Sequence, residues 1–142
     1  MILFLDTSAL VKLYIDETES QAVHDAVAGA EVVAVCRIAW AEAHAALARR
    51  VREVPEDEAA IETARQALAR DWPRFLIVEV TQKLVERAAE FADTFALRGY
   101  DSVQLAAAYE ILDTAQTEVM FAGFDNRLNK AARTLGLELP GP

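Results

Sequence analysis

The sequence has little of several features that small proteins use to bind ligands or to cross membranes. Cys36 is its only cysteine and it has two histidines, so no intrachain disulfide can form and no Cys/His cluster offers zinc-ligand spacing. Its five glycines and four prolines form no linker, which favours a single domain over residues 1–142. No apolar run approaches the ~20 residues of a membrane span. We therefore expect a cytoplasmic protein that does not enter a membrane.

Positive charge is also scarce. Lys and Arg number 14 against 23 Asp and Glu, giving a formal net charge of −9, which is the wrong sign for a general electrostatic grip on nucleic acid. A nucleic-acid ligand would require a local inversion of charge, such as acidic side chains loaded with divalent cations. Apolar residues, by contrast, make up 54% of the chain and are ample for a folded core.

Short apolar runs alternate with amphipathic segments along the chain. Strands are expected at 2–5, 31–35, 75–80 and 119–122, with 137–139 as a candidate edge strand. Helices are expected at 9–16, 19–28, 37–53, 55–72, 81–95, from 101 onward, and at 126–135. Parallel neighbours need long crossover connections, so this order predicts a three-layer α/β/α fold around a central, mostly parallel four- to five-stranded sheet.

Four acidic residues are candidates for a site, since such a sheet binds ligands beyond the carboxyl ends of its strands and two of the four fall there. Asp6 and Asp125 follow the first and fourth strands, Asp101 begins a helix, and Glu42 lies on or beside the apolar stripe of another. Each aspartate alone has an ordinary explanation as a helix cap, and Asp101 with Gln104 resembles a capping box. The ordinary alternative for Glu42 is a salt bridge to an arginine, because an unpaired carboxylate there is costly.

The joint pattern points to a metal site. Like charges at ~4 Å repel by on the order of 4 kcal/mol per pair at an effective dielectric near 20, so four carboxylates in one cleft need a divalent cation or bound protons. Oxygen-only ligation suits Mg²⁺ or Mn²⁺ rather than zinc. The sequence therefore predicts that four residues hold Mg²⁺ or Mn²⁺, namely Asp6, Glu42, Asp101 and Asp125.

The segments around these acids resemble the PIN-domain proteins, and more narrowly the VapC-type toxins of bacterial toxin–antitoxin pairs. They are residues 5–11, 41–42, 100–108 and 124–128, which occur in the family's order over nearly the whole chain. The resemblance implies a PIN-like fold and an endoribonuclease that cleaves RNA phosphodiester bonds with a metal-activated water. It implies that the four acids are metal ligands and catalytic residues, and that a hydroxyl of Thr7 or Ser8 belongs to the site. It also implies a cognate antitoxin and a homodimer.

One position departs from the family's pattern, and two basic residues lie near the acids. The family often has Thr or Ser two residues before the fourth aspartate, where this chain has Gly123. A hydroxyl that would orient a metal-bound water is missing there, which weakens the case for Asp125. Because an acidic pocket repels phosphates, basic residues must position them, and Arg98 and Arg127 lie closest in sequence to the third and fourth acids.

Apolar side chains on the helices around Pro55 have two interpretations. Trp40, Leu47, Leu68 and Trp72 either pack in the core or, where exposed, form a groove for a helix of the antitoxin.

Other functions fit the sequence less well. A Mg²⁺-dependent phospho-acceptor or signalling domain needs adjacent acids after its first strand, but Asp6 is followed by Thr7 and Ser8. A haloacid-dehalogenase-type phosphatase needs a second aspartate at the position of Ser8. A catalytically silent PIN-like interaction module keeps the fold and drops the chemistry; the presence of all four acids favours the enzyme, and an RNA cleavage assay discriminates the two.

Overall fold

The computed structural model describes residues 1–141, in which four parallel strands form the central sheet. The strands are β1 (Ile2–Leu5), β2 (Val32–Cys36), β3 (Leu76–Val78) and β4 (Val119–Ala122), in the order β3-β2-β1-β4. β1 is central, because Phe4 pairs with Ala34 on one side and with Phe121 on the other. The predicted parallel α/β sheet is confirmed, and every strand pair in it is parallel.

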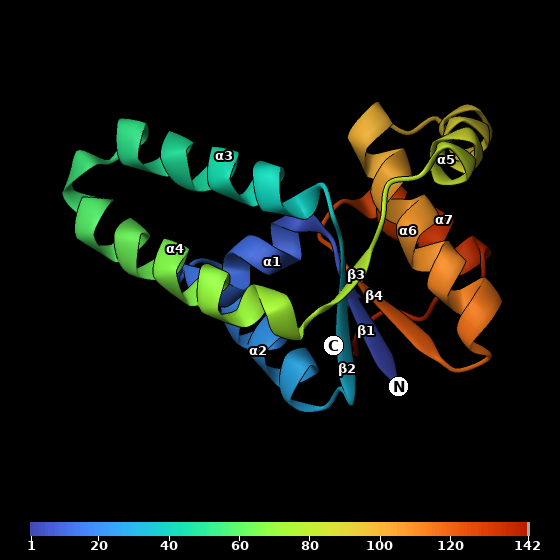
Figure 1. Cartoon of the computed structure of the whole chain (residues 1–142), viewed down its shortest axis with the longest axis horizontal. Coiled ribbons are helices and arrows are strands. Elements are labelled where there is room, and N and C mark those ends of the chain that lie inside the picture. The colour runs from blue at the N-terminus through green and yellow to red at the C-terminus, as the bar shows by residue number, and fades with distance from the viewer. Residues whose placement is uncertain (142) are drawn as a thin grey trace.

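Helices cover both faces of the sheet and make the predicted three layers (Figure 1). One face carries α1 (Thr7–Tyr14), α2 (Ser20–Ala28), α3 (Ala39–Glu53) and α4 (Glu58–Asp71), and the other α5 (Gln82–Phe95), α6 (Gly99–Ala115) and α7 (Asn126–Thr134). Side chains alternate along a strand, so Leu3 and Leu5 pack against the first group while Phe4 packs against the second. The α3–α4 hairpin reaches beyond the sheet, around a small core of its own (Figure 1).

Several element boundaries differ from the sequence prediction. The third strand ends at Val78 rather than at 80, because Glu79 turns out to solvent and pairs with Arg37. The helix predicted at 55–72 is α4 between two short 3-10 turns, η1 (Pro55–Asp57) and η2 (Trp72–Arg74), each holding a proline. The candidate edge strand at 137–139 contributes one parallel bridge, from Glu138 to Met120, so the sheet keeps four strands.

The apolar residues of the α3–α4 hairpin divide between core and surface. Leu47 and Leu68 are buried, as core packing requires. Trp40 stays 37% exposed, with its ring centroid 5.1 Å from that of Trp72 and 4.5 Å from that of His44. An aromatic cluster thus reaches the surface on this side of the molecule.

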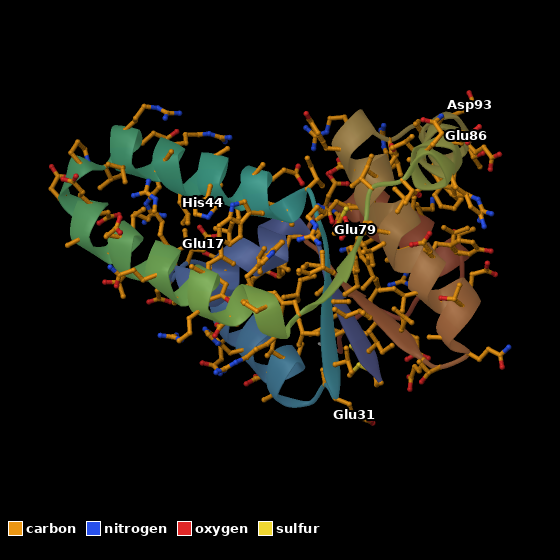
Figure 2. The ribbon with its side chains drawn as sticks, viewed as in Figure 1. Glu17, Glu31, His44, Glu79, Glu86 and Asp93 are labelled. Carbon is orange, nitrogen blue, oxygen red and sulfur yellow. The ribbon has the colours of Figure 1, made fainter. Side chains whose placement is uncertain are left out.

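The excess negative charge is spread over the outside of the molecule. Glu31 and Glu79 lie far apart on the surface, and Glu86 and Asp93 lie near each other on α5 (Figure 2). Within residues 1–141, no helix is both long and apolar enough to span a membrane. Of the four acids predicted for the site, Asp6 and Asp125 lie at the carboxyl ends of β1 and β4.

Candidate metal centre and active site

All six residues predicted for the site line one cleft of about 290 Å³. The sheet and its flanking helices bring them together from distant parts of the chain: Asp6 follows β1, Thr7 and Ser8 open α1, Glu42 lies in the first turn of α3, Asp101 in that of α6, and Asp125 precedes α7. The cleft also includes Arg98, Gln104 and Phe124. The gathering predicted at the carboxyl edge of the sheet is present.

Asp6 is the most deeply placed of the four acids, with 5% of its surface exposed. Its Oδ1 accepts hydrogen bonds from the Ala9 N–H (2.9 Å) and from Ser8 Oγ (2.7 Å), so it caps α1 as well as lining the cleft. Burial raises the pKa of Asp6 to about 6, and repulsion from Asp101 and Glu42 adds to the effect against those two hydrogen bonds. A buried carboxylate with other acids beside it is a candidate ligand for a cation.

Glu42 is held by two side chains rather than by an arginine. Thr7 Oγ1 donates to Glu42 Oε1 at 2.8 Å, and Gln104 Nε2 donates to the same oxygen at 2.9 Å and to Thr7 Oγ1 at 3.0 Å. The alternative of a salt bridge from Glu42 is not observed within residues 1–141. Gln104 is 2% exposed and lines the cleft. It was not predicted as a site residue, because its spacing from Asp101 indicated a capping box instead.

The helix caps fall differently from the sequence prediction. Asp125 does cap α7, accepting from the Leu128 N–H at 2.9 Å. Asp101 caps nothing, because α6 begins two residues earlier than predicted, at Gly99, with Arg98 in the capping position. The ordinary explanation for Asp101 is therefore removed, and its carboxylate is left for other partners.

Arg98 is the partner that Asp101 has in the structure. Its Nε lies 3.3 Å from Asp101 Oδ2, and its Nη2 lies 3.9 Å from Asp125 Oδ2. The Arg98 side chain is 83% exposed, so the pairing is solvated and easily exchanged. The Arg98 guanidinium thus lies between Asp101 and Asp125 at the mouth of the cleft.

The donor set fits a hard divalent cation in its chemistry. It offers four carboxylates and two hydroxyls, all oxygen, as Mg²⁺ and Mn²⁺ prefer. As the side chains lie, no three acids within residues 1–141 stand close enough together to share an ion. Oε1 of Gln104 is buried and has no hydrogen-bond partner among the described residues.

Comparison with known proteins assigns the family. The PIN domain model matches residues 3–133. The chain belongs to the PIN-domain family. It is 31% identical over 135 residues to the Ribonuclease VapC45 and the Ribonuclease VapC49 of Mycobacterium tuberculosis, which covers 95% of this chain and 92% of each relative. The resemblance to VapC-type PIN domains drawn from the sequence is confirmed.

Solved structures agree on the PIN-domain fold. The FitAcB structure from Neisseria gonorrhoeae superposes with a TM-score of 0.65 at 16% identity, covering 99% of this chain and 97% of that one. VapBC2 from Rickettsia felis, bound to a DNA fragment from its promoter, gives a TM-score of 0.58 at 16% identity, covering 98% and 97%. A toxin–antitoxin complex from Klebsiella pneumoniae gives 0.57 at 19% identity, covering 83% of each chain. At these identities the likeness shows the fold alone.

Gly123, the departure from the PIN-domain pattern, has a structural reason. A β-carbon at position 123 would stand 2.5 Å from Asp6 Oδ2 and 3.1 Å from the ring of Phe121. Because real side chains do not approach so closely, the space that a Thr or Ser would need is taken by the Asp6 carboxylate. The glycine is therefore tied to the position of Asp6 rather than to that of Asp125.

The two arginines that lie close in sequence to the third and fourth acids differ in their positions. Arg98 lines the cleft, whereas Arg127 turns away and donates to the carbonyl oxygen of Ala96 at 3.0 Å. A wider groove of about 680 Å³ between α1 and α3 joins the cleft and adds Lys12, Arg49 and Arg50 to its walls. Basic groups thus lie on the α1–α3 side of the acids, a location that sequence proximity did not indicate.

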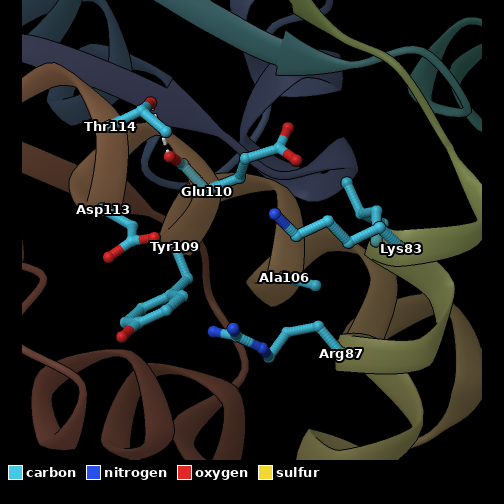
Figure 3. Close-up of a pocket in the computed structure, with 8 residues that line it drawn as sticks. Lys83, Arg87, Ala106, Tyr109, Glu110, Asp113 and Thr114 are labelled. Atoms are coloured by element: carbon cyan, nitrogen blue, oxygen red, sulfur yellow. Dashed lines mark hydrogen bonds between the residues drawn. The ribbon is translucent and has the colours of Figure 1, made fainter.

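A second cavity lies away from these acids, between α5 and α6 (Figure 3). It measures about 270 Å³ and contains none of the predicted site residues. Arg87 reaches across it, with its guanidinium carbon 5.1 Å from the centre of the Tyr109 ring, and Asp113 stands at the other end (Figure 3). Neither Arg87 nor Asp113 lines the cleft that holds the four acids.

Proposed function

We propose that this chain is a metal-dependent endoribonuclease and the toxin of a toxin–antitoxin pair. The observation that carries the proposal is the single cleft lined by the four acids together with Thr7 and Ser8. The two relatives that are 31% identical over 95% of the chain are ribonucleases by name, which supports a nuclease. The all-oxygen donor set supports Mg²⁺ or Mn²⁺ as the ion.

The metal ligands would be Asp6, Glu42, Asp101 and Asp125. A divalent ion bound there supplies a water activated for attack on phosphorus and stabilises the charge that develops on the phosphate. The protein's own contribution is to hold the carboxylates in place beforehand. Ser8 fixes Asp6, and Thr7 with Gln104 fixes Glu42, so two of the acids lose little freedom when the ion binds.

Arg98 has the role of receiving the substrate phosphate. Its guanidinium already lies between two carboxylates at the mouth, and its exposure leaves it free to turn toward RNA. Arginine suits this task because its planar fork donates two parallel hydrogen bonds to phosphate oxygens. In the adjoining groove Arg49 adds a positive charge away from the acids, which opposes the repulsion from the net charge of −9, whereas Lys12 there is paired with Glu17 at 3.2 Å.

The test is cleavage of structured RNA by the pure protein in Mg²⁺ or Mn²⁺. We expect cuts that leave 5′-phosphate and 3′-hydroxyl ends, no cutting in EDTA, and a loss of at least about 100-fold in Asp6→Asn. Asp113→Asn, an exposed acid on α6, should cut as the wild type does. Cutting that persists in EDTA or in Asp6→Asn would refute the metal site, and failure to cut any RNA would favour a silent interaction module.

The partner proposal is a cognate antitoxin that blocks this site, and the state proposed for the chain is a homodimer. Support for an antitoxin comes from the VapC-type relatives and from solved neighbours described as toxin–antitoxin assemblies. The aromatic cluster at Trp40 and Trp72 offers an apolar surface for a partner helix. Loss of a co-purified partner in Trp72→Asp, with the fold intact by circular dichroism, would support this surface, and unaffected pairing would count against it. Sedimentation of the pure protein measures the oligomeric state.

A further inference from the structure

Tyr100 is the most exposed of the large hydrophobic side chains in residues 1–141. It is 64% exposed, and the next, Leu76, is 44% exposed. Within the described residues, its hydroxyl makes no hydrogen bond and its ring pairs with no other aromatic ring. Single exposed apolar side chains are common and need no explanation by themselves. The position of Tyr100 is what calls for one, because it directly precedes Asp101 in the first turn of α6.

Tyr100 lines an open recess that adjoins the acidic cleft. The recess, of about 600 Å³, is formed by Glu42, Val103 and residues 98–101. It shares Glu42, Arg98 and Asp101 with the cleft. An RNA strand with one phosphate at the acids would therefore have its neighbouring nucleotide at the recess. A β-carbon added to Gly99, which also lines the recess, would meet no atom of residues beyond its chain neighbours within 4 Å. We call this recess the Tyr100 shelf.

We propose that the Tyr100 shelf is a nucleobase-binding subsite, in which an unpaired base adjoining the scissile phosphate stacks on the Tyr100 ring. The inference rests on the proposed ribonuclease function and adds a contact to the base. Sequence-specific RNA recognition relies largely on unpaired bases stacked on aromatic side chains and hydrogen-bonded at their edges. A tyrosine ring beside an arginine offers such a stacking surface together with a phosphate contact.

The charge of the protein makes a stacking contact especially useful. With a net charge of −9, the molecule as a whole repels RNA, and the affinity that basic residues supply falls as salt rises. Base stacking needs no charge and keeps its strength in salt. It also selects single-stranded segments, because a base paired within a helix offers no free face to the ring. The shelf would therefore direct the acids toward loops and unpaired ends.

A binding experiment tests the shelf, with every variant made in the Asp6→Asn background to prevent cleavage. The probe is a fluorescein-labelled RNA hairpin with a cut site mapped by the wild type, and the readout is anisotropy. Tyr100→Ala should weaken binding by roughly 5- to 150-fold, while Tyr100→Phe, which keeps the ring, should stay within about 2-fold. Leu76→Ala, which removes an exposed apolar side chain from the start of β3, should bind as the parent does.

An abasic nucleotide moved along the hairpin separates stacking from a structural effect. At one position beside the cut site, the missing base should weaken binding to the parent but not to Tyr100→Ala. The proposal would be overturned if Tyr100→Ala bound the hairpin as tightly as the parent does. It would also be overturned if, at every position, the abasic nucleotide weakened binding to Tyr100→Ala as much as binding to the parent. A Tyr100→Ala that changes only self-association would overturn it as well, because the ring would then contact protein. If the wild type neither cuts nor binds RNA, the proposed function fails and the shelf with it; a wild type that cuts while Tyr100→Ala binds normally refutes the shelf alone.

Discussion

The carboxylate of Asp6 occupies the space that a side chain at position 123 would need. Asp6 Oδ2 would stand 2.5 Å, and Asp6 Cγ 3.0 Å, from a β-carbon built on Gly123. Oδ1 of the same carboxylate is fixed by Ser8 and by the Ala9 N–H, so the group has little room to move aside. The family often has a hydroxyl residue at this position, but in this chain the absence of a side chain at Gly123 leaves the space that the Asp6 carboxylate occupies.

Gly123→Ser should consequently displace Asp6. Overpacking of this kind costs about 1–3 kcal/mol of the free energy of unfolding, and a shifted Asp6 should also bind Mn²⁺ more weakly. Urea unfolding and calorimetric titration measure the two effects. Gly29→Ala is the control, since its β-carbon would meet neighbours no closer than 3.7 Å. A Gly123→Ser protein with unchanged stability and Mn²⁺ affinity would show that Asp6 does not depend on the glycine.

The stability of the metal-free protein should fall between pH 4 and pH 7 through Asp6. Burial raises the pKa of Asp6 from 3.8 to about 6, so the folded state holds this proton more tightly than the unfolded chain does. The stabilisation is complete below pH 3.8 and is lost as pH rises through 6, with a total on the order of 3 kcal/mol. Asp6→Asn cannot ionise, and its Oδ1 can still accept both hydrogen bonds.

Unfolding of wild type and Asp6→Asn by urea in EDTA, at several pH values, isolates this contribution. Asp6→Asn should be more stable than the wild type at pH 8, and the difference should shrink toward pH 4. A difference that does not change with pH would mean that the pKa of Asp6 is not raised in the folded state.

Much of this architecture is visible in the sequence because it follows from local pattern. Continuous apolar runs marked the four strands, and their alternation with helices fixed the parallel sheet, whose carboxyl edge gathers Asp6 and Asp125. The predicted start of α6 was wrong by two residues. The helix begins at Gly99, although glycine is a poor helix former, and Asp101 therefore has no capping role. Boundaries of this kind depend on tertiary contacts that no local pattern records.

The polar contacts around the acids were the part that the sequence could not supply. Gln104 lies 62 residues from Glu42 and 97 from Thr7, so only the fold brings their side chains together. The contact of Arg127 with Ala96, and that of Arg98 with Asp125, likewise depend on how α5, α6 and α7 meet. The reason for Gly123 required the position of Asp6 in space.

Gln104→Met should destabilise the protein and loosen Glu42. The change removes two hydrogen bonds from a side chain that is 2% exposed and leaves a carboxylate without its buried donor, a loss of about 1–3 kcal/mol in the free energy of unfolding. Urea unfolding measures it, with Gln66→Met on the exposed face of α4 as the matched control. Equal stability of Gln104→Met and the wild type would indicate that the three-residue contact contributes nothing.

Arg98→Gln and Arg127→Gln should differ in RNA binding although both remove one exposed charge. Arg98 lines the cleft with the acids and is the residue proposed to contact a phosphate, so its loss should weaken binding and lower the slope of log affinity against log salt by roughly 0.7–1. Arg127 is tethered to the Ala96 carbonyl and should leave the slope nearly unchanged. Salt titrations of RNA binding in the Asp6→Asn background compare them, and equal slopes would remove Arg98 from the phosphate contact.

The most direct test of the four-carboxylate centre is Mn²⁺ binding followed by electron paramagnetic resonance at pH 7.5. Asp101 is the informative position, because it caps no helix and its neutral replacement removes only a solvated contact with Arg98. The wild type and Asp113→Asn, on the same helix, should bind Mn²⁺ equally, and Asp101→Asn should bind at least about 10-fold more weakly. Equal binding by Asp101→Asn and the wild type, or no binding by the wild type, would contradict the metal centre.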